Sequence, residues 1–321
     1  MRLVALAPGK VNLCLALGAL RPDGRHELVT LIESLSLADE LELVTRVALH
    51  DEVVCAGVEE PNIVAQALAG LRALRWPAPK VKITVHKRIP VAAGMGGGSA
   101  DAAATLRIAQ RLAPVPEALI WRLAAQLGAD VPSQLDPGLV LATGAGEVVE
   151  PVGGLAGEVV EPVGGLAGEV IQPVGGLAGE VGPHALTLLP SSSESLSTAA
   201  VYAEADRLGL SRTPAQLAAL RGELRAALRE PGRLPAALLV NDLAPAALAL
   251  CPSIEVALEA ARDAGAEDVL VCGSGPTVAG LFWGADAPAR AALAAGSLAG
   301  RFPRAAVAVP VARGFGFPLF A

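Results

Sequence analysis

One segment of this chain limits its possible folds more than any other: a strand pattern that runs into a cluster of glycines and then into a helical pattern. Val81–His86 alternates apolar and polar residues, which predicts a half-buried strand. Gly94–Ser99 then contains four glycines, and a helix-forming run rich in Ala and Leu follows. Glycines let a phosphate approach the backbone closely, and the N-terminus of a helix attracts anions. The segment therefore predicts a phosphate-binding loop.

The spacing within this loop excludes two common nucleotide-binding motifs. A Walker A loop requires Lys and then Ser or Thr after its last glycine, and a dinucleotide-binding fingerprint requires GxGxxG early in a βαβ unit. Ser99 has an alternative role as the N-cap of the helix, which is compatible with a contact to phosphate or Mg²⁺. Asp101 is the nearest carboxylate, but the helix dipole explains its position equally well. The metal ligands are therefore unknown from the sequence.

Composition narrows the class of protein further. A chain of 321 residues exceeds the size at which one hydrophobic core usually stops growing, which predicts two domains. A net charge of −7 and only 3% aromatic residues argue against a nucleic-acid partner. The four cysteines form no CxxC pair, which excludes the common zinc spacings and predicts reduced thiols in the cytoplasm.

The N-terminal run MRLVALAPGKVNLCLALGAL superficially resembles a signal peptide. Lys10 and Asn12 interrupt its apolar stretch, so we do not expect secretion. No uncharged run approaches a bilayer span, so we expect a cytoplasmic protein without a membrane partner. The sequence does not fix the oligomeric state, and a monomer or a weak homodimer is compatible with it.

The remaining patterns predict a mixture of strands and helices, and therefore an α+β fold. Strands are expected at Arg2–Ala7, Val11–Gly18, Glu40–Leu49, Ala185–Leu189, Asp268–Cys272, Thr277–Trp283 and Ala305–Val311. Helices are expected at Asn62–Leu74, Pro116–Leu127, Thr198–Gly209, Pro214–Leu228, Pro235–Leu250, Ser253–Gly265 and Ala287–Ala299.

An internal repeat lies between the two halves. The unit AGEVVEPVGGL occupies Ala145–Leu155 and Ala156–Leu166, returns as AGEVIQPVGGL at Ala167–Leu177, and ends in a fragment at Ala178–Gly182. One hypothesis is a binding or assembly element, and the favoured one is a tandem duplication that extends a surface hairpin, because its period is too short for a solenoid. The predicted division is 1–144, a repeat insertion at 145–182, and 183–321.

Two charged residues stand in apolar surroundings where an unused charge is costly. Lys10 lies within ALAPGKVNLCLAL, and Asp130 lies within GADVP. Phosphoryl transfer needs a cation near the transferred group and a group that holds the acceptor hydroxyl. Both residues fit these roles, but Lys10 has an alternative in extending to solvent at a strand edge. Asp130 has an alternative as a helix N-cap, which spacing alone favours.

Together these motifs resemble the GHMP kinases. The resemblance rests on PGKVNLCLAL, RPDGRHELVTL, the glycine-rich loop and GADVP in that order, with TAAVY at Thr198–Tyr202, Asn241–Leu243 and GSGPT at Gly273–Thr277. It covers nearly the whole chain outside the repeat. It implies an N-terminal domain like ribosomal protein S5 domain 2, a ferredoxin-like C-terminal α+β domain, and an active site between them.

The resemblance also implies an activity, a substrate and site residues. The set including DGxHE is most similar to the branch that uses ATP and Mg²⁺ to phosphorylate the 2-hydroxyl of 4-diphosphocytidyl-2-C-methyl-D-erythritol, in the non-mevalonate isoprenoid pathway. Asp130 is then the catalytic base and Lys10 its cationic partner. Asn12 and Thr198 contact the methylerythritol side, while His26 and Tyr202 bind cytosine. The residues over the ATP phosphates are Pro90, Val91, Ala92, Ala93, Gly94, Met95, Gly96, Gly97, Gly98, Ser99 and Ala100.

Three features depart from the pattern of this branch. Arg25 stands where an aromatic residue usually stacks on cytosine, and its guanidinium plane offers a substitute. Ala100 replaces a second serine of the loop, and the repeat enlarges a segment that is usually short. Two other functions stay open at this point. One is another GHMP kinase, acting on mevalonate or homoserine, and the other is a non-catalytic nucleotide-binding module whose repeat docks a partner.

Overall fold

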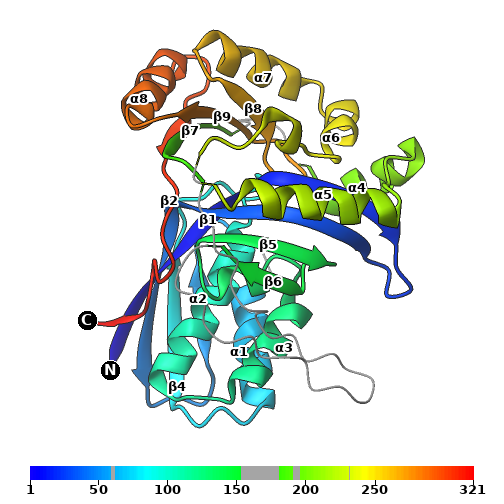
Figure 1. Cartoon of the computed structure of the whole chain (residues 1–321). Helices are drawn as coiled ribbons and strands as arrows, with labels where there is room; N and C mark the ends of the chain where they lie inside the picture. Colours follow the sequence, from blue (N-terminus) through cyan, green and yellow to red (C-terminus); the bar gives the residue numbers. More distant parts are fainter. Residues whose placement is uncertain (59–61, 153–180, 191–195, 231) are drawn as a thin grey trace.

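The computed structural model describes residues 1–58, 62–152, 181–190, 196–230 and 232–321, which form two β-sheets flanked by helices (Figure 1). In the described part, seven strands form the first sheet in the order β11-β1-β2-β4-β3, with β5 paired to β2 and β6 to β5. They are β1 (Arg2–Leu20), β2 (His26–Arg46), β3 (Glu52–Cys55), β4 (Lys80–His86), β5 (Leu139–Gly144), β6 (Val148–Pro151) and β11 (Leu319–Phe320). The second sheet, in the order β10-β7-β9-β8, contains β7 (His184–Leu189), β8 (Asp268–Val271), β9 (Val278–Trp283) and β10 (Ala306–Ala308).

The two long strands β1 and β2 pair as an antiparallel hairpin. The predicted break between Arg2–Ala7 and Val11–Gly18 is wrong, because β1 continues through Pro8 and Gly9. The pairing with β2 shifts register between Pro8 and Lys10, and such an irregularity tolerates a residue without an N–H. Figure 1 shows this hairpin between the helices drawn below it and the second sheet with its helices drawn above it.

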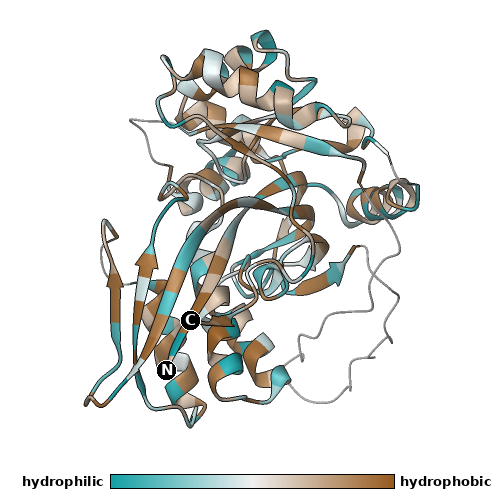
Figure 2. Ribbon diagram, turned by 90° about the vertical axis from the view of Figure 1, so that its left-hand side faces the viewer, coloured by the Kyte–Doolittle hydropathy of each residue, from teal (hydrophilic) through white to brown (hydrophobic). Residues whose placement is uncertain are grey.

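Three helices cover one face of the first sheet: α1 (Ile63–Ala73), α2 (Gly97–Leu112) and α3 (Glu117–Leu127). Asn62 caps α1 through a 2.8 Å hydrogen bond from Val64 N to its Oδ1. Leu71 and Leu106 on the helices pack with Ile83 on the sheet in one buried cluster. In Figure 2 the strands carry long apolar stretches, whereas the outer helices alternate apolar and polar residues. This layer holds the glycine-rich loop at the start of α2.

Among the described residues of the second half, five α-helices form: α4 (Thr198–Leu208), α5 (Pro214–Ala227), α6 (Ala244–Leu250), α7 (Ser253–Asp263) and α8 (Ala287–Leu298). Helices α7 and α8 pack on the second sheet. Leu220 and Leu224 of α5 are buried in the same cluster as Leu13 of β1 and Leu281 of β9. The β1–β2 hairpin therefore shares a hydrophobic core with the second half of the chain.

The helix predicted over Pro235–Leu250 is wrong in its first half. A short 3₁₀ turn at Ala236–Leu238 ends before α6 begins at Ala244. Between them the backbone pairs with β1, since Leu15 N donates to Val240 O at 2.7 Å and Asp242 N donates to Leu15 O at 2.9 Å. These long-range hydrogen bonds replace the helical ones, which explains why local propensity misled the prediction.

The repeat falls largely outside the described residues, because 153–180 are among those the structure does not describe. Its first residues form the turn between β5 and β6 and the strand β6 itself. The predicted division at 144 and 182 stays a prediction. Among the described residues no single helix is long and apolar enough to cross a membrane, although the bent pair α6 and α7 meets that test when taken together.

Candidate active site

A cleft of about 900 Å³ opens between the glycine-rich loop, the β1–β2 hairpin and α4. It brings together nearly all residues that the sequence singled out. The lining includes Lys10, Asn12, Arg25, His26, Pro90, Val91, Ala92, Ala93, Gly94, Met95, Gly96, Gly97, Gly98, Ser99, Asp130, Thr198 and Tyr202. Ala100 is the exception, because it is fully buried inside α2.

The glycine-rich loop needs its glycines for two different reasons. Gly94 has a φ of 75°, and a Cβ built there would lie 2.0 Å from the carbonyl oxygen of Cys272. Gly96 has a φ of 66°, forms the N-cap of α2, and makes no side-chain capping bond. The alternative role of Ser99 as the N-cap is therefore wrong, and Ser99 lies in the first helical turn. The loop presents the N-terminus of α2 without a side-chain cap, which is a favourable site for an anion.

Lys10 and Asp130 meet within this cleft. Lys10 is only 4% exposed, and its Nζ lies 2.7 Å from Asn12 Oδ1 and 3.4 Å from Asp130 Oδ2. Asn12 Nδ2 in turn donates to Thr30 Oγ1 at 2.8 Å, which fixes the direction of the amide. Lys10 is thus held by polar partners within a central strand, and the alternative of a lysine that extends to solvent is wrong.

The loop after α3 brings Asp130 to Lys10. Gly128 ends α3, and a 3₁₀ turn begins after Val131 with no side-chain cap at its start. The alternative of Asp130 as an N-cap is therefore not what the structure contains. Its side chain is 35% exposed, so one partner is buried and the other remains open to the cleft. This pair offers a fixed positive charge beside a carboxylate that a ligand can reach.

Aromatic groups from β2 and α4 line another part of the cleft, called here its aromatic end. The rings of His26 and Tyr202 lie 5.2 Å apart with 34° between their planes. His26 Nε2 also lies 2.8 Å from Asp206 Oδ1, a partner that the sequence analysis missed although it follows Tyr202 by one turn of α4. Burial, together with the charge of Asp130, raises the pKa of Tyr202, so its phenol stays protonated. The arrangement supplies a flat face and a ring nitrogen held by a carboxylate.

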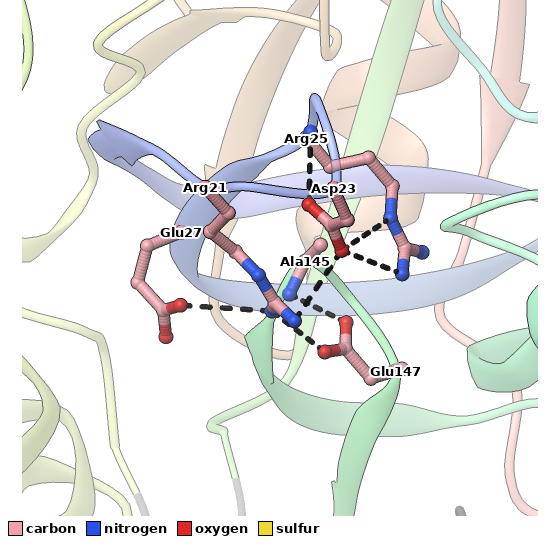
Figure 3. A network of polar contacts seen from close by, with 6 residues as sticks. All are labelled: Arg21, Asp23, Arg25, Glu27, Ala145 and Glu147. Atoms are coloured by element: carbon pink, nitrogen blue, oxygen red, sulfur yellow. Dashed lines mark hydrogen bonds and ion pairs between the residues drawn. The ribbon is translucent and has the colours of Figure 1, made fainter. Parts of the chain in front are cut away.

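Arg25 lies at the tip of the hairpin near this aromatic end. Its Nη2 lies 3.1 Å from Asp23 Oδ2, and its backbone N–H donates to Asp23 Oδ1 at 3.0 Å (Figure 3). The Arg25 guanidinium is thus paired with Asp23, and its stacking on a base stays a prediction. Thr198, at the start of α4, lies 3.1 Å from Ser274 through the two hydroxyl oxygens. Ser274 belongs to the GSGPT segment and was not among the predicted site residues.

A second cation, the half-buried Lys87, lies beside the glycine-rich loop and was not predicted. Lys87 Nζ lies 2.7 Å from Asp101 Oδ2 and also contacts Asp39. Burial raises the pKa of Asp101 to about 7 against the opposing effect of Lys87. A Cβ built on Gly97 would lie 3.3 Å from Lys87 Nζ, so this ammonium borders the loop. Asp101 is therefore a partner of Lys87 and not only a residue placed by the helix dipole.

A glycine-rich loop at a helix N-terminus, opposite a lysine–carboxylate pair in a cleft large enough for two ligands, is the arrangement of a small-molecule kinase. Comparison with known proteins supports the same class, a small-molecule kinase. Residues 62–138 match the GHMP kinases N terminal domain, and residues 217–299 match the GHMP kinases C terminal domain.

Individual relatives narrow the class. A protein of Nocardia farcinica named 4-diphosphocytidyl-2-C-methyl-D-erythritol kinase is 39% identical over 317 residues, covering 96% of this chain and 94% of that one. A crystal structure of 4-(cytidine 5′-diphospho)-2C-methyl-D-erythritol kinase aligns with a TM-score of 0.66 and 30% identity, covering 96% of this chain and 99% of that one. Homoserine kinase from Cytophaga hutchinsonii aligns with a TM-score of 0.65 at 18% identity, covering 99% and 96%, which shows a shared fold alone. The chain belongs to the GHMP kinase family and shares its two-domain α+β fold.

Proposed function

We propose that this kinase transfers the γ-phosphoryl group of ATP to the 2-hydroxyl of 4-diphosphocytidyl-2-C-methyl-D-erythritol, an intermediate of isoprenoid precursor synthesis. The observation that carries the proposal is the ordering of groups along one cleft. A Cβ built on Gly96 of the glycine-rich loop would lie 3.0 Å from the Lys10 side chain, and Lys10 lies 3.4 Å from Asp130. The charge of Asp130 in turn raises the pKa of Tyr202, whose ring lies 5.2 Å from that of His26. This order matches ATP, a reacting hydroxyl and a cytosine base.

Asp130 is proposed as the group that accepts the proton of the attacking hydroxyl. Its carboxylate is open to the cleft, and Lys10 lies 3.4 Å away to hold it in place and to balance negative charge. In phosphoryl transfer the protein chiefly positions the reactants and stabilises the charge on the transferred group. Asn12 supports this arrangement, because its Oδ1 accepts from Lys10 and thereby limits where the ammonium can point.

The loop over residues 90–100 is proposed to hold the phosphates of ATP. The backbone at Gly96–Gly98 can approach an anion closely, and the open N-terminus of α2 adds favourable electrostatics. When bound, Mg²⁺ would neutralise phosphate charge. Within the described residues no cluster of three or more His, Cys, Asp or Glu side chains could hold a metal by itself. The oxygen donors Ser99 and Asp130 line the cleft and fit an ion that Mg·ATP brings with it.

The aromatic end is proposed to bind the cytidine. Tyr202 offers a ring face for stacking, and His26 offers a ring nitrogen whose orientation the Asp206 carboxylate sets. Thr198 and Asn12 also line the cleft and are proposed to contact the methylerythritol. Neither mevalonate nor homoserine carries a base, so a site for either substrate would give this end of the cleft no ligand.

Phosphorus NMR of the product tests the proposal directly. The protein is incubated with Mg·ATP and the cytidyl substrate, and the proton-coupled spectrum is recorded. The 2-hydroxyl is on a carbon without hydrogen, so its phosphate has no three-bond coupling to a carbinol proton and we expect a narrow new monoester signal. A doublet or triplet from a secondary or primary alcohol phosphate would contradict the assignment of the acceptor.

A further inference from the structure

An ion pair outside the predicted site connects the hairpin tip to the first unit of the repeat. Arg21 Nη1 donates to Glu147 Oε1 at 2.7 Å, and the Glu147 side chain is only 8% exposed (Figure 3). We infer that Arg21 and Glu147 form an anchor that fixes the hairpin tip and thereby sets the affinity for the cytidine end of the substrate. This inference rests on the proposed function, because it assigns that end of the cleft to a cytidine.

The hairpin side of the anchor is tightly organised. Arg21 N donates to Arg25 O at 2.7 Å, and Gly24 N donates to Arg21 O at 3.0 Å, which closes the turn. The Arg21 guanidinium also lies 3.4 Å from Asp23 and 3.6 Å from Glu27. The backbone of Arg21 closes the turn, and its side chain links Asp23 and Glu27 of the hairpin to Glu147. Loss of this link is therefore expected to shift Arg25 and the following His26 relative to the cleft.

The other side of the anchor is a turn that belongs to the repeat. Glu147 accepts a hydrogen bond from Ala145 N through its second carboxylate oxygen. Gly144 and Gly146 have φ values of 70° and 96°, and a Cβ on Gly146 would lie 2.6 Å from Ala129 O. The turn therefore packs directly against the residue before Asp130. One short segment connects the loop of the proposed base with the hairpin of the proposed cytidine site.

Beyond this turn the described residues of the first repeat unit continue to 152 and form part of the fold. Val148–Pro151 pairs with β5, and the buried carboxylate of Glu150 contacts Arg221 and Arg225 of α5. The favoured hypothesis, a tandem duplication that extends a surface hairpin, stays a prediction, because residues 153–180 lie outside the described part of the chain. The first unit of the repeat contributes to the wall of the cleft, where Ala145 and Gly146 are lining residues.

The test measures binding of cytidine 5′-diphosphate by calorimetry in the presence of a saturating non-hydrolysable ATP analogue. Glu147→Gln keeps an acceptor for Ala145 N but removes the charge facing Arg21, and Arg21→Ala removes the other partner. Each variant is expected to weaken binding roughly five- to twentyfold, the effect of losing one partly buried charged hydrogen bond. The Kd of the ATP analogue is expected to stay unchanged.

The double variant and a matched control separate positioning from general damage. The double variant Arg21→Ala, Glu147→Gln is expected to bind cytidine 5′-diphosphate no more weakly than the weaker-binding single variant. The reason is that both changes remove the same ion pair. Glu158 occupies the identical position in the second repeat copy, so Glu158→Gln serves as the control and is expected to leave both affinities unchanged.

Several results would overturn the anchor. One is wild-type protein that does not bind cytidine diphosphate, another is variants that bind it as tightly as wild type, and a third is parallel losses for both ligands. The proposed reaction fails separately, when wild type binds cytidine diphosphate but does not phosphorylate the cytidyl substrate.

Discussion

Lys10, on the central strand β1, and Asp130, in the loop that follows α3, form an ion pair of 3.4 Å in which the lysine is almost fully buried and the aspartate is partly open. A buried ammonium is costly unless it is paired, and here it is held from two sides by Asn12 and Asp130. The side that remains accessible is the carboxylate. This asymmetry is what a base that must contact a substrate hydroxyl requires.

Replacing the carboxylate should therefore affect turnover and not nucleotide binding. Asp130→Asn keeps the shape of the side chain and removes its basicity, so we expect kcat to fall roughly 10²- to 10⁴-fold, as is usual for a lost general base. The Kd for ATP, measured by calorimetry, should stay close to that of wild type. A variant with unchanged kcat would exclude Asp130 as the base.

The glycine-rich loop offers a matched pair of substitutions. Gly94→Ala places a methyl group 2.0 Å from the carbonyl of Cys272 at a φ of 75°, whereas Gly98→Ala meets only Ile63 at 3.7 Å. We expect Gly94→Ala to destabilise the fold by at least about 1–2 kcal/mol from the left-handed backbone alone. Gly98→Ala should unfold nearly as wild type does. Urea denaturation of both variants measures the difference, and equal midpoints would contradict the close approach.

The aromatic end can be tested through Tyr202. Tyr202→Ala should raise the KM for the cytidyl substrate. If a base stacks on the ring, the binding free energy lost is roughly 1–3 kcal/mol. Tyr202→Phe keeps the ring and should retain most of that affinity. Steady-state kinetics with both variants separates the ring from the hydroxyl. An unchanged KM in Tyr202→Ala would remove Tyr202 from the cytidine site.

A buried histidine between the two sheets predicts a pH-dependent stability. His184 Nε2 lies 2.7 Å from Glu33 Oε2, and its Nδ1 lies 2.9 Å from Gly182 O. Burial alone would lower the pKa of His184, but the Glu33 carboxylate and the Gly182 carbonyl together raise it above its ordinary value of 6.5. The stabilisation that the protonated His184 gains from Glu33 is fully present below pH 6.5. It is lost as the pH rises through the higher pKa of His184 in the folded state.

Denaturation with urea at several pH values measures this contribution. We expect the free energy of unfolding of wild type to fall as the pH rises above 6.5, and His184→Gln to lack that part of the decline. The pair joins β2 to β7, so the effect concerns the contact between the two sheets. If wild type and the variant had parallel profiles, the charged His184–Glu33 pair would be excluded.

The sequence was sufficient for the family and the α+β fold, and nearly all the site residues that it predicted line the cleft. Glycines beside a helical pattern, and isolated charges in apolar segments, are local signals with few alternative explanations. Gly94 and Lys10 could be found in this way, because each residue type is costly at its position unless the site needs it.

The features that were missed depend on pairing between distant segments. Arg21 and Glu147 are 126 positions apart, and neither is unusual in its own segment. Lys87 follows a polar strand end, where a lysine normally faces solvent, and only its ion pairs with Asp39 and Asp101 hold it half-buried beside the loop. Similarly, β1 continues through Pro8 and Gly9 because β2 pairs along its length, which local breaker signals cannot reveal.

The account depends most on one claim, that this kinase acts on a cytidine-bearing alcohol. Release of ADP by the purified protein with Mg·ATP, measured separately with 4-diphosphocytidyl-2-C-methyl-D-erythritol, mevalonate and homoserine, tests it most directly. We predict turnover with the cytidyl substrate alone. Equal or faster turnover with mevalonate or homoserine, or ATP binding without turnover of any of the three, would contradict the account.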